Sequence, residues 1–212
     1  MFGLNLNIKL NDTEVFLTQY DRKYAEHIAK LSSSIKVKRF SGGSYAWVED
    51  DVIDMFESLR KSRDSVYWLV FADKSKLPIG YTGINSIARD GGCTFETMIF
   101  DTSFWNKGIG TQVAMLRVWY ATKQLNRSFI KAIVAEGNGA SLKILKKIGF
   151  FETGKHIRSV YRDGVYYDNL VMYWLNPDRV DVLYPEGVPP EYEKYIKIAE
   201  EVLERVDKNI KV

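Results

Sequence analysis

The sequence predicts an α+β domain built on a mixed sheet, and three observations support this prediction. First, the middle of the chain indicates a βαβ unit, because two apolar segments, Thr94 to Phe100 and Phe129 to Ala135, flank an amphipathic stretch from Val113 to Tyr120. Second, shorter strand-like segments lie on both sides of this unit and alternate with helical ones. Third, the pair Asp163-Gly164 between two strand-like segments is a strong signal for a β-hairpin.

Before the βαβ unit, strands and helices alternate. We expect a helix from about Arg22 to Leu31 with Asp21 as its N-cap, because an aspartate oxygen accepts hydrogen bonds from first-turn N–H groups. A second helix is expected from Val48 to Leu59, and the polar, basic segment from Ser32 to Gly43 predicts a loop between them. Strands are expected at three segments rich in apolar and β-forming residues: Thr13 to Leu17, Tyr67 to Ala72 and Gly80 to Ile87.

After the glycine turn and its helix, the segment from Phe129 to Ala135 is apolar except for Lys131 and predicts a buried central strand. A short helix should follow and end at Gly149, since Leu142, Leu145 and Ile148 share one face. The hairpin then joins strands at Phe151 to Ile157 and Tyr166 to Trp174.

Prolines interrupt the chain after Leu175, so we expect one domain over residues 1–176 and a linker with a C-terminal helix over 177–212. Apolar residues in that helix recur at spacings of three and four, which gives an apolar stripe: Tyr192, Tyr195, Ile196, Ala199, Val202, Leu203, Val206 and Ile210. Such a stripe must be covered, either by its own domain or by a second copy in a homodimer.

Composition is ordinary for an enzyme-sized domain, with 212 residues, 46% apolar and 27% charged. No apolar run approaches the length of a membrane span, and the first residues lack a secretory signal, so we expect a cytoplasmic protein without membrane contact. The single cysteine, Cys93, excludes an intramolecular disulfide. His27 and His156 are isolated, so we expect no metal. The net charge of +3 is too small to indicate direct nucleic-acid binding.

A glycine turn lies between the strand ending at Phe100 and the helix beginning near Val113, and it consists of Trp105, Asn106, Lys107, Gly108, Ile109, Gly110 and Thr111. A strand, a glycine turn and a helix start have the geometry of a phosphate cradle, because exposed N–H groups and the helix dipole face an anion. An ordinary tight βα connection is the alternative. A dinucleotide fingerprint fails at Val113, and a Walker-like match at residues 149–155 fails at His156.

A second cluster follows the next strand: Asn138, Ser141, Lys147, Gly149 and Phe150. Together the two segments resemble the GNAT superfamily of acyl-CoA-dependent N-acetyltransferases over roughly Asp12 to Leu175. The tryptophan at the first position of the glycine turn is similar to the branch that includes RimJ and RimL, which acetylates the N-termini of ribosomal proteins. The resemblance implies the GNAT fold, a central and mostly antiparallel mixed sheet flanked by helices, and acetyl-CoA as the acetyl donor.

The resemblance also implies where the coenzyme binds. The end of the strand before the glycine turn, residues Met98, Ile99 and Phe100, would pair through its backbone with the pantetheine arm, and the pyrophosphate would lie on the glycine turn. Asn138 would hydrogen-bond the arm or cap the following helix, and Ser141 and Lys147 complete the expected coenzyme contacts.

Three residues are candidates for acid–base catalysis. Glu96 is the only charged residue in its strand, so it is the candidate general base; the alternatives are a solvent-facing position or a structural ion pair. Glu136 is the second candidate, and a water relay is a third route for an α-amine. The family pattern places a leaving-group tyrosine where this chain has Leu145, so Ser141 becomes the candidate acid, or a residue that bonds helix N–H groups.

If the family layout holds, the acceptor lies against aromatic residues of the loop between the first two helices and of the hairpin: Tyr45, Trp47, Tyr161 and Tyr167. The sequence thus predicts direct acetyl transfer in a ternary complex to a primary amine, chiefly the N-terminal amine of a protein or peptide. The alternatives are a small amine, such as a polyamine or aminoglycoside, and a regulatory protein that binds acyl-CoA without turnover.

Overall fold

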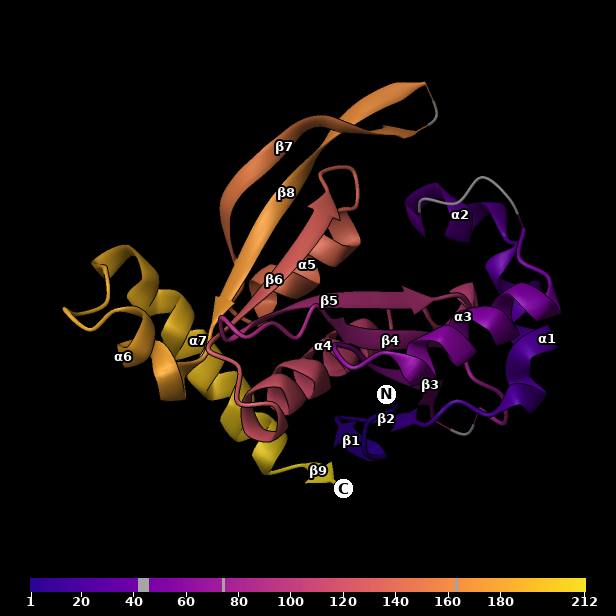
Figure 1. The fold of residues 1–212 in the computed structure, drawn as a ribbon, viewed down its shortest axis with the longest axis horizontal. Helices are drawn as coiled ribbons and strands as arrows, with labels where there is room; N and C mark the ends of the chain where they lie inside the picture. The colour runs from indigo at the N-terminus through magenta and orange to yellow at the C-terminus, as the bar shows by residue number, and fades with distance from the viewer. Residues whose placement is uncertain (42–45, 74, 163) are drawn as a thin grey trace. The chain divides into compact units, whose positions relative to one another are not determined.

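The computed structural model describes residues 1–41, 46–73, 75–162 and 164–212, and Figure 1 shows its elements. Within these ranges nine strands hydrogen-bond in the order β7-β8-β6-β5-β4-β3-β2-β1-β9. The β5–β6 pair is parallel, whereas β1–β2, β2–β3, β3–β4, β6–β8 and β7–β8 are antiparallel. The predicted α+β fold with a mixed, mostly antiparallel sheet is confirmed.

The strands have the following bounds: β1 Leu6–Leu10, β2 Thr13–Thr18, β3 Val66–Ala72, β4 Gly80–Asn85, β5 Gly92–Ile99, β6 Phe129–Ala135, β7 Phe151–Arg162, β8 Val165–Leu175 and β9 Ile210–Lys211. The α-helices are α1 Ala25–Ser32, α2 Ile35–Ser41, α3 Glu49–Lys61, α4 Ile109–Trp119, α5 Gly139–Lys147, α6 Val180–Leu183 and α7 Pro190–Asp207. Short 3₁₀ turns lie at Arg22–Tyr24, Thr102–Phe104 and Pro177–Arg179, and a π-turn at Tyr120–Gln124 extends α4.

The chain forms two compact units. The first comprises Met1–Asn85, Glu96–Val113 and Asn209–Val212, and the second comprises Ser86–Phe95 and Ala114–Lys208. Both β5 and α4 therefore contribute residues to each unit. The helix α7 belongs to the second unit, and the predicted division into residues 1–176 and 177–212 stays a prediction.

In the first unit, α1 and α3 bury their apolar faces against β3, β4 and the end of β5. The shared core includes Ile28 of α1, Phe56 of α3, Leu69 of β3, Tyr81 of β4 and Phe100, all at most 4% exposed. Burying each side chain of this size stabilises the fold by about 1.5–3 kcal/mol, which explains why the helical periodicity was visible in the sequence.

In the second unit, β6 pairs with β8 from Phe129 to Ala135, and β8 pairs with β7 beyond the end of β6. The two long strands continue past β6 as a two-stranded ribbon (Figure 1). The hairpin is confirmed as a strand pair, although Asp163 of its predicted turn lies outside the described residues. Gly149 has φ +100° and ends α5 as predicted, since a left-handed residue after a helix favours glycine.

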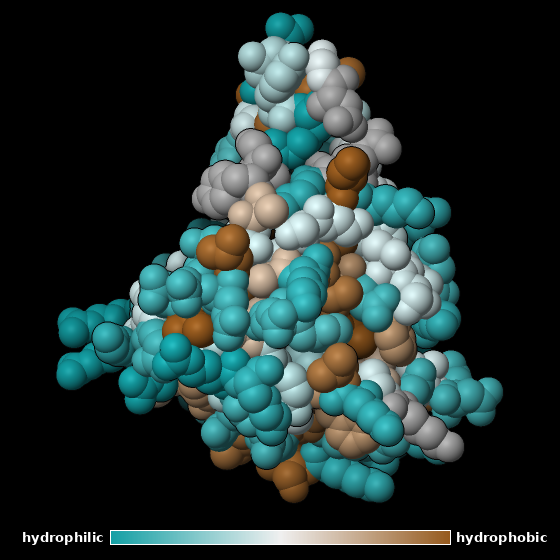
Figure 2. Space-filling model, turned by 90° about the vertical axis from the view of Figure 1, so that its right-hand side faces the viewer, coloured by the Kyte–Doolittle hydropathy of each residue, from teal (hydrophilic) through white to brown (hydrophobic). Residues whose placement is uncertain are grey.

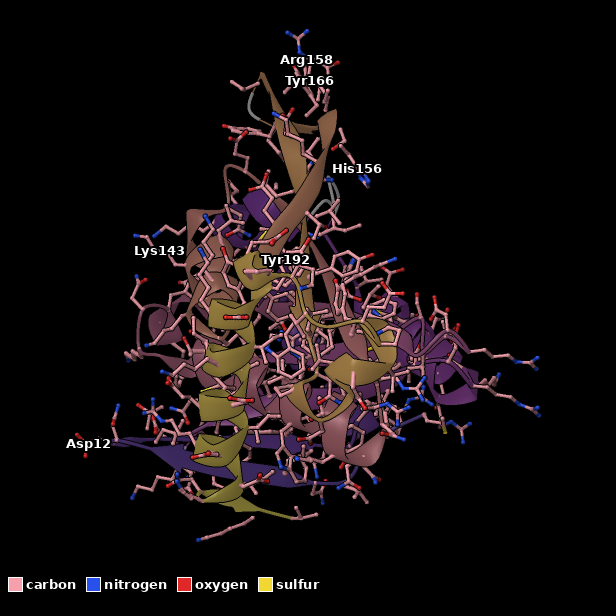
Figure 3. The ribbon with its side chains drawn as sticks, turned by 90° about the vertical axis from the view of Figure 1, so that its left-hand side faces the viewer. Asp12, Lys143, His156, Arg158, Tyr166 and Tyr192 are labelled. Atoms are coloured by element: carbon pink, nitrogen blue, oxygen red, sulfur yellow. The ribbon has the colours of Figure 1, made fainter. Side chains whose placement is uncertain are left out.

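The apolar stripe of the C-terminal helix is buried within its own unit. Val202, Leu203 and Val206 are at most 8% exposed. The ring of Phe151 on β7 stacks on Tyr192 at 4.6 Å between centroids, and Figure 3 labels Tyr192 on α7. The chain itself covers this part of the stripe, and the homodimer stays a prediction. The prediction that Ile210 belongs to this helix is wrong, because Ile210 lies in β9.

Several predicted elements need correction. The segment Ser32 to Gly43 is not all loop, because Ile35–Ser41 forms α2 and Val37 is buried in the core at 4% exposed. The strand β1 was not predicted. The strand β6 is not uniformly buried, since Ile133 is 55% exposed. Asp21 caps a 3₁₀ turn that precedes α1, where its carboxylate accepts from the N–H of Lys23 at 3.1 Å.

The face drawn in Figure 2 is mostly hydrophilic, with hydrophobic side chains scattered among polar ones. Such scattering is normal for a folded domain. Among the helices described here, none is long and apolar enough to cross a membrane.

Candidate active site

The first unit holds a small pocket of about 60 Å³ beside β5. Four residues that the sequence singled out meet there: Trp47, Glu96, Met98 and Phe100. The remaining lining residues are Ser32, Lys38 and Tyr81. Three of these seven side chains are aromatic, and Glu96 is the one acid among them.

The Glu96 carboxylate accepts three hydrogen bonds from neighbouring strands. Tyr81 donates its hydroxyl to Oε1 at 2.6 Å, and Tyr67 donates to Oε2 at 2.9 Å. The amide of Asn85 also donates to Oε2, at 3.2 Å. Glu96 is half-buried, so these donors replace the water that a carboxylate would otherwise bind. The solvent-facing alternative for Glu96 is therefore wrong.

Burial raises the pKa of both tyrosine hydroxyls, and the negative charge of Glu96 raises each pKa further. Both tyrosines are only 4% exposed, so their phenolate forms would be poorly solvated. They consequently stay protonated at physiological pH and act as donors to the carboxylate.

Aromatic rings form one wall of the pocket. The Trp47 ring lies 5.8 Å from that of Phe100 and 6.4 Å from that of Tyr81, centroid to centroid. The ammonium of Lys38 sits 5.4 Å from the Trp47 ring centroid. This contact shows that the Trp47 face attracts a cation. Tyr45, also expected in this wall, lies outside the described residues.

The two edges of β5 differ near its end. The N–H groups of Phe100 and Asp101 both donate to the carbonyl of Ile79, at 2.8 and 3.1 Å. The N–H of Phe100 is therefore already bonded within the chain. The carbonyl of Met98 also faces β4, at Gly80. Backbone groups alternate along a strand, so Ile99 directs its N–H to the opposite edge.

The register between β5 and β6 covers Gly92 to Thr94. Among the described residues, no backbone carbonyl accepts from the N–H of Ile99. Of the three residues predicted to pair with the coenzyme arm, Ile99 has the backbone direction that such pairing requires.

The glycine turn has the backbone of an anion cradle. Asn106 and Gly108 take positive φ values of 61° and 79°, and residues 105–108 are exposed. The helix α4 begins at Ile109, whose side chain is buried and anchors the turn. Among the described residues, no carbonyl accepts from the N–H groups of residues 107–110, so these groups fit a diphosphate.

Trp105 makes a structural contact, and its expected contact with the coenzyme stays a prediction. Its indole N–H donates to the carbonyl of Ile99 at 2.9 Å. This bond ties the glycine turn to the end of β5 on the edge that carries the free Ile99 N–H. Trp105 is 37% exposed, so part of its ring also remains accessible to a ligand.

In the second unit, Asn138 is the N-cap of α5. Its side-chain oxygen accepts from the N–H of Ser141 at 3.2 Å, which confirms the capping alternative. The hydroxyl of Ser141 is half-exposed and, among the described residues, has no hydrogen-bond partner. Lys147 is exposed in the last turn of α5, where the helix dipole stabilises a positive charge.

The last two residues of this cluster are structural. A Cβ at Gly149 would approach the carbonyl of Tyr195 to 3.0 Å, so glycine allows α7 to pack closely. Phe150 is fully buried with its ring 6.1 Å from that of Phe95. Gly149 and Phe150 of the predicted signature therefore contribute to folding.

The hairpin residues lie apart from any pocket described here. Tyr161 is 57% exposed and pairs with Tyr166, their ring centroids 4.9 Å apart. Figure 3 labels Tyr166 and Arg158 near the far end of the ribbon. Tyr167 lies over Gly137, where a Cβ would meet its ring at 2.8 Å.

Asp168 orders the ribbon. Its carboxylate accepts from the N–H of Arg158 and pairs with Lys155, both at 2.8 Å, and these contacts lower the pKa of Asp168, the Lys155 hydrogen bond most strongly. Glu136, the second candidate base, is exposed.

Sequence reasoning missed Tyr67, Tyr81 and Asn85. Each lies in a predicted strand or beside its end, and none forms a motif with Glu96 along the chain. The one available signal was chemical: a buried tyrosine hydroxyl needs an acceptor, and a carboxylate within an apolar strand needs donors.

With this geometry in view, comparison with known proteins identifies the class. The family model of the acetyltransferase (GNAT) domain matches residues 14–151, more than half of the chain. The chain belongs to this family. It is a GNAT-type acetyltransferase that uses acetyl-CoA, and the fit of the glycine turn to a diphosphate agrees with this assignment.

Individual relatives support the family. The chain is 32% identical over 123 residues to YjcK, a probable N-acetyltransferase of Bacillus subtilis (strain 168), covering 58% of this chain and 67% of YjcK. Its fold is similar to that of spermidine N-acetyltransferase from Vibrio cholerae, solved with CoA and spermine. The TM-score is 0.69 at 18% identity, over 76% of this chain and 95% of that one.

RimJ from Mycobacterium smegmatis, solved with CoA-disulfide, is also similar in fold. The TM-score is 0.74 at 13% identity, over 96% of this chain and 93% of RimJ. At this level of identity the likeness concerns the fold.

The glycine turn can be tested with two matched substitutions. Gly108→Ala should weaken CoA binding about tenfold, because an alanine at positive φ is strained by about 1–2 kcal/mol and the exposed turn will relax when no ligand holds it. Asn106→Gly, at the other positive-φ residue, should change the Kd by less than about threefold, since glycine tolerates this region. Calorimetry with CoA measures both; equal affinity for Gly108→Ala and the unchanged protein would contradict the cradle.

Proposed function

We propose that this acetyltransferase acetylates the N-terminal α-amine of a protein or peptide by direct transfer in a ternary complex. The observation that supports this choice is the pocket around Glu96, which combines one carboxylate with an aromatic wall. An ammonium group gains from both features, through charge attraction and through contact with aromatic faces.

The charges of the pocket favour an acceptor with one positive charge. Among the described residues that line it, Glu96 is the acid and Lys38 the base. A polyamine carries two or more ammonium groups at pH 7, and its second charge would find Lys38 rather than a further carboxylate among the lining residues. A peptide N-terminus brings a single ammonium to Glu96.

The chemistry requires little from the base when the acceptor is an α-amine. With a pKa of about 7.7–8.0, roughly 9–17% of an α-amine is already neutral at pH 7. Acetyl-CoA supplies an acetyl group activated as a thioester. In our proposal, Glu96 binds the acceptor ammonium and takes up its proton, which leaves the nitrogen lone pair able to form the amide bond.

The backbone contributions come from the same unit as Glu96. The N–H of Ile99 lies on the open edge of β5, and we assign it to the pantetheine arm. The N–H groups of residues 107–110, with the Lys107 side chain, are assigned to the pyrophosphate. The indole of Trp105 fixes these two segments to one another.

Ser141 is our candidate for the acid that protonates the departing thiolate. Its N–H is fixed by the Asn138 cap and its hydroxyl keeps its donor capacity. Replacing Ser141 with alanine should lower kcat about 100-fold, the low end for a general acid, and leave the Kd for CoA unchanged. A wild-type kcat for this variant would remove Ser141 from the mechanism.

An acceptor panel tests the function. The full-length protein is incubated with acetyl-CoA and peptides that carry a free α-amine, the same peptides with a blocked N-terminus and an internal lysine, or spermidine. Thiol release gives the rate, and the mass of the acceptor gives the product. We expect acetylation of the free α-amine peptides; turnover of spermidine but of no peptide would contradict the proposed acceptor class.

Glu96→Gln should lower kcat/KM for the peptide about 100-fold at pH 7, and the deficit should shrink toward pH 9, where an α-amine is already mostly neutral. The glutamine keeps the shape of the side chain and removes its charge. Glu136→Gln should stay within about twofold, because its exposed side chain is not part of the pocket. A loss confined to Glu136→Gln, or a pH-independent loss in Glu96→Gln, would show that Glu96 is not the base.

A further inference from the structure

We propose that Tyr67 and Tyr81 are positioning residues for acetyl transfer, and that Gly83 is the residue that lets Tyr67 reach the carboxylate of Glu96. The two tyrosines hold this carboxylate in one orientation in the pocket. This inference rests on the role proposed for Glu96 and adds three residues to it.

Tyr67 reaches its acceptor across a whole strand. It lies on β3, whereas Glu96 lies on β5, and β4 runs between them. In the β3–β4 register Tyr67 is opposite Gly83. A Cβ built on Gly83 would lie 2.5 Å from Cε1 of the Tyr67 ring, 2.7 Å from Cδ1 and 2.8 Å from Cζ. The ring therefore lies on the bare backbone of Gly83, and any side chain at this position would displace it.

The backbone conformation does not require a glycine here. Gly83 is not among the residues with positive φ, and it lies within the regular strand β4. Glycine inside a strand weakens the strand, so its presence calls for a close approach by another group. In this protein the approaching group is the Tyr67 ring, whose hydroxyl ends 2.9 Å from Oε2 of Glu96.

Tyr81 holds the other carboxylate oxygen. Its hydroxyl lies 2.6 Å from Oε1, within the range of a charge-assisted O–H···O⁻ bond. Its ring is packed edge-on against Phe56 at 5.9 Å and lies 5.7 Å from Phe100. Packing on several sides leaves the ring few alternative rotamers, so the donor stays in place.

The backbone of Glu96 is fixed as well. The hydroxyl of Thr82 donates to the carbonyl of Glu96 at 3.0 Å and lies 2.8 Å from the hydroxyl of Thr97. Two successive residues of β4, Tyr81 and Thr82, thus hold the carboxylate and the carbonyl of Glu96. A group that must meet an acceptor nitrogen at hydrogen-bond distance needs this kind of support.

The charged and titratable groups that face Glu96 in the described part of the chain are Lys38 on α2, Tyr67 on β3 and Tyr81 on β4. The raised pKa of each tyrosine keeps it a neutral donor. Because each hydroxyl holds one oxygen of the carboxylate, removing one donor lets the Glu96 side chain leave its orientation in the pocket.

Two substitutions test the proposal from different sides. Tyr67→Phe removes the hydroxyl and keeps the ring, and Gly83→Ala keeps the hydroxyl and displaces the ring. Each should lower kcat/KM for an α-amine peptide about tenfold at pH 7. The Kd for CoA should not change, because neither residue belongs to the glycine turn or to Ile99.

Matched controls exist for both. Tyr20→Phe removes a buried hydroxyl that has no hydrogen-bond partner among the described residues, and Gly154→Ala adds a methyl group that meets nothing within 4 Å. Both controls should keep the wild-type kcat/KM.

A double-mutant cycle separates this proposal from the one on which it rests. In a Glu96→Gln background, Tyr67→Phe should cause no further loss, since its effect passes through the missing carboxylate. If Glu96→Gln lowers activity while Tyr67→Phe and Gly83→Ala behave like the controls, the positioning role is wrong and the base role stands. An equal loss from Tyr67→Phe with and without Glu96 also refutes positioning. A fully active Glu96→Gln overturns both roles.

Discussion

The strand β5 is held along one edge and released along the other, and the site depends on this asymmetry. On the β4 side, Ile79 accepts two N–H groups at the strand end and Thr82 holds the carbonyl of Glu96. On the other edge the ladder with β6 ends after Thr94. Because unpaired backbone groups must find a partner, we propose that the N–H of Ile99 pairs with the coenzyme. The indole N–H of Trp105 donates to the carbonyl of Ile99 and so ties the glycine turn to the end of β5.

The same strand gives the first unit its carboxylate. A half-buried acid is costly unless donors replace its water, and the donors here come from β3 and β4. Their placement is a consequence of the sheet: Tyr81 is on the adjacent strand, and Tyr67 is one strand further and crosses Gly83. The fold thus places a charged, supported group beside an aromatic wall, which is an arrangement suited to binding and deprotonating an ammonium group.

Features that depend on a few neighbouring residues could be predicted from the sequence. The glycine turn, the bounds of β6 and the cap at Asn138 follow from local backbone chemistry. Glu96 stood out because it was the one charge in an apolar strand. The supporting residues could not be predicted, because Tyr67 and Glu96 are 29 positions apart and meet only through the strand order. Likewise, which N–H of Met98, Ile99 and Phe100 is available depends on Ile79, a partner outside that strand. The helix α2 was not predicted because its basic residues outnumber the apolar ones around the core residue Val37.

Amide hydrogen exchange at two successive residues tests the account most directly. Phe100 and Ile99 lie side by side in sequence, but the first N–H is bonded to Ile79 and the second lies on the open edge of β5. Without ligand, the Phe100 amide should exchange slowly and the Ile99 amide quickly; with saturating CoA, Ile99 should become protected while Phe100 stays as it was. An Ile99 amide that is already protected without ligand, or that CoA leaves unchanged, would contradict the proposal that the coenzyme pairs with this edge.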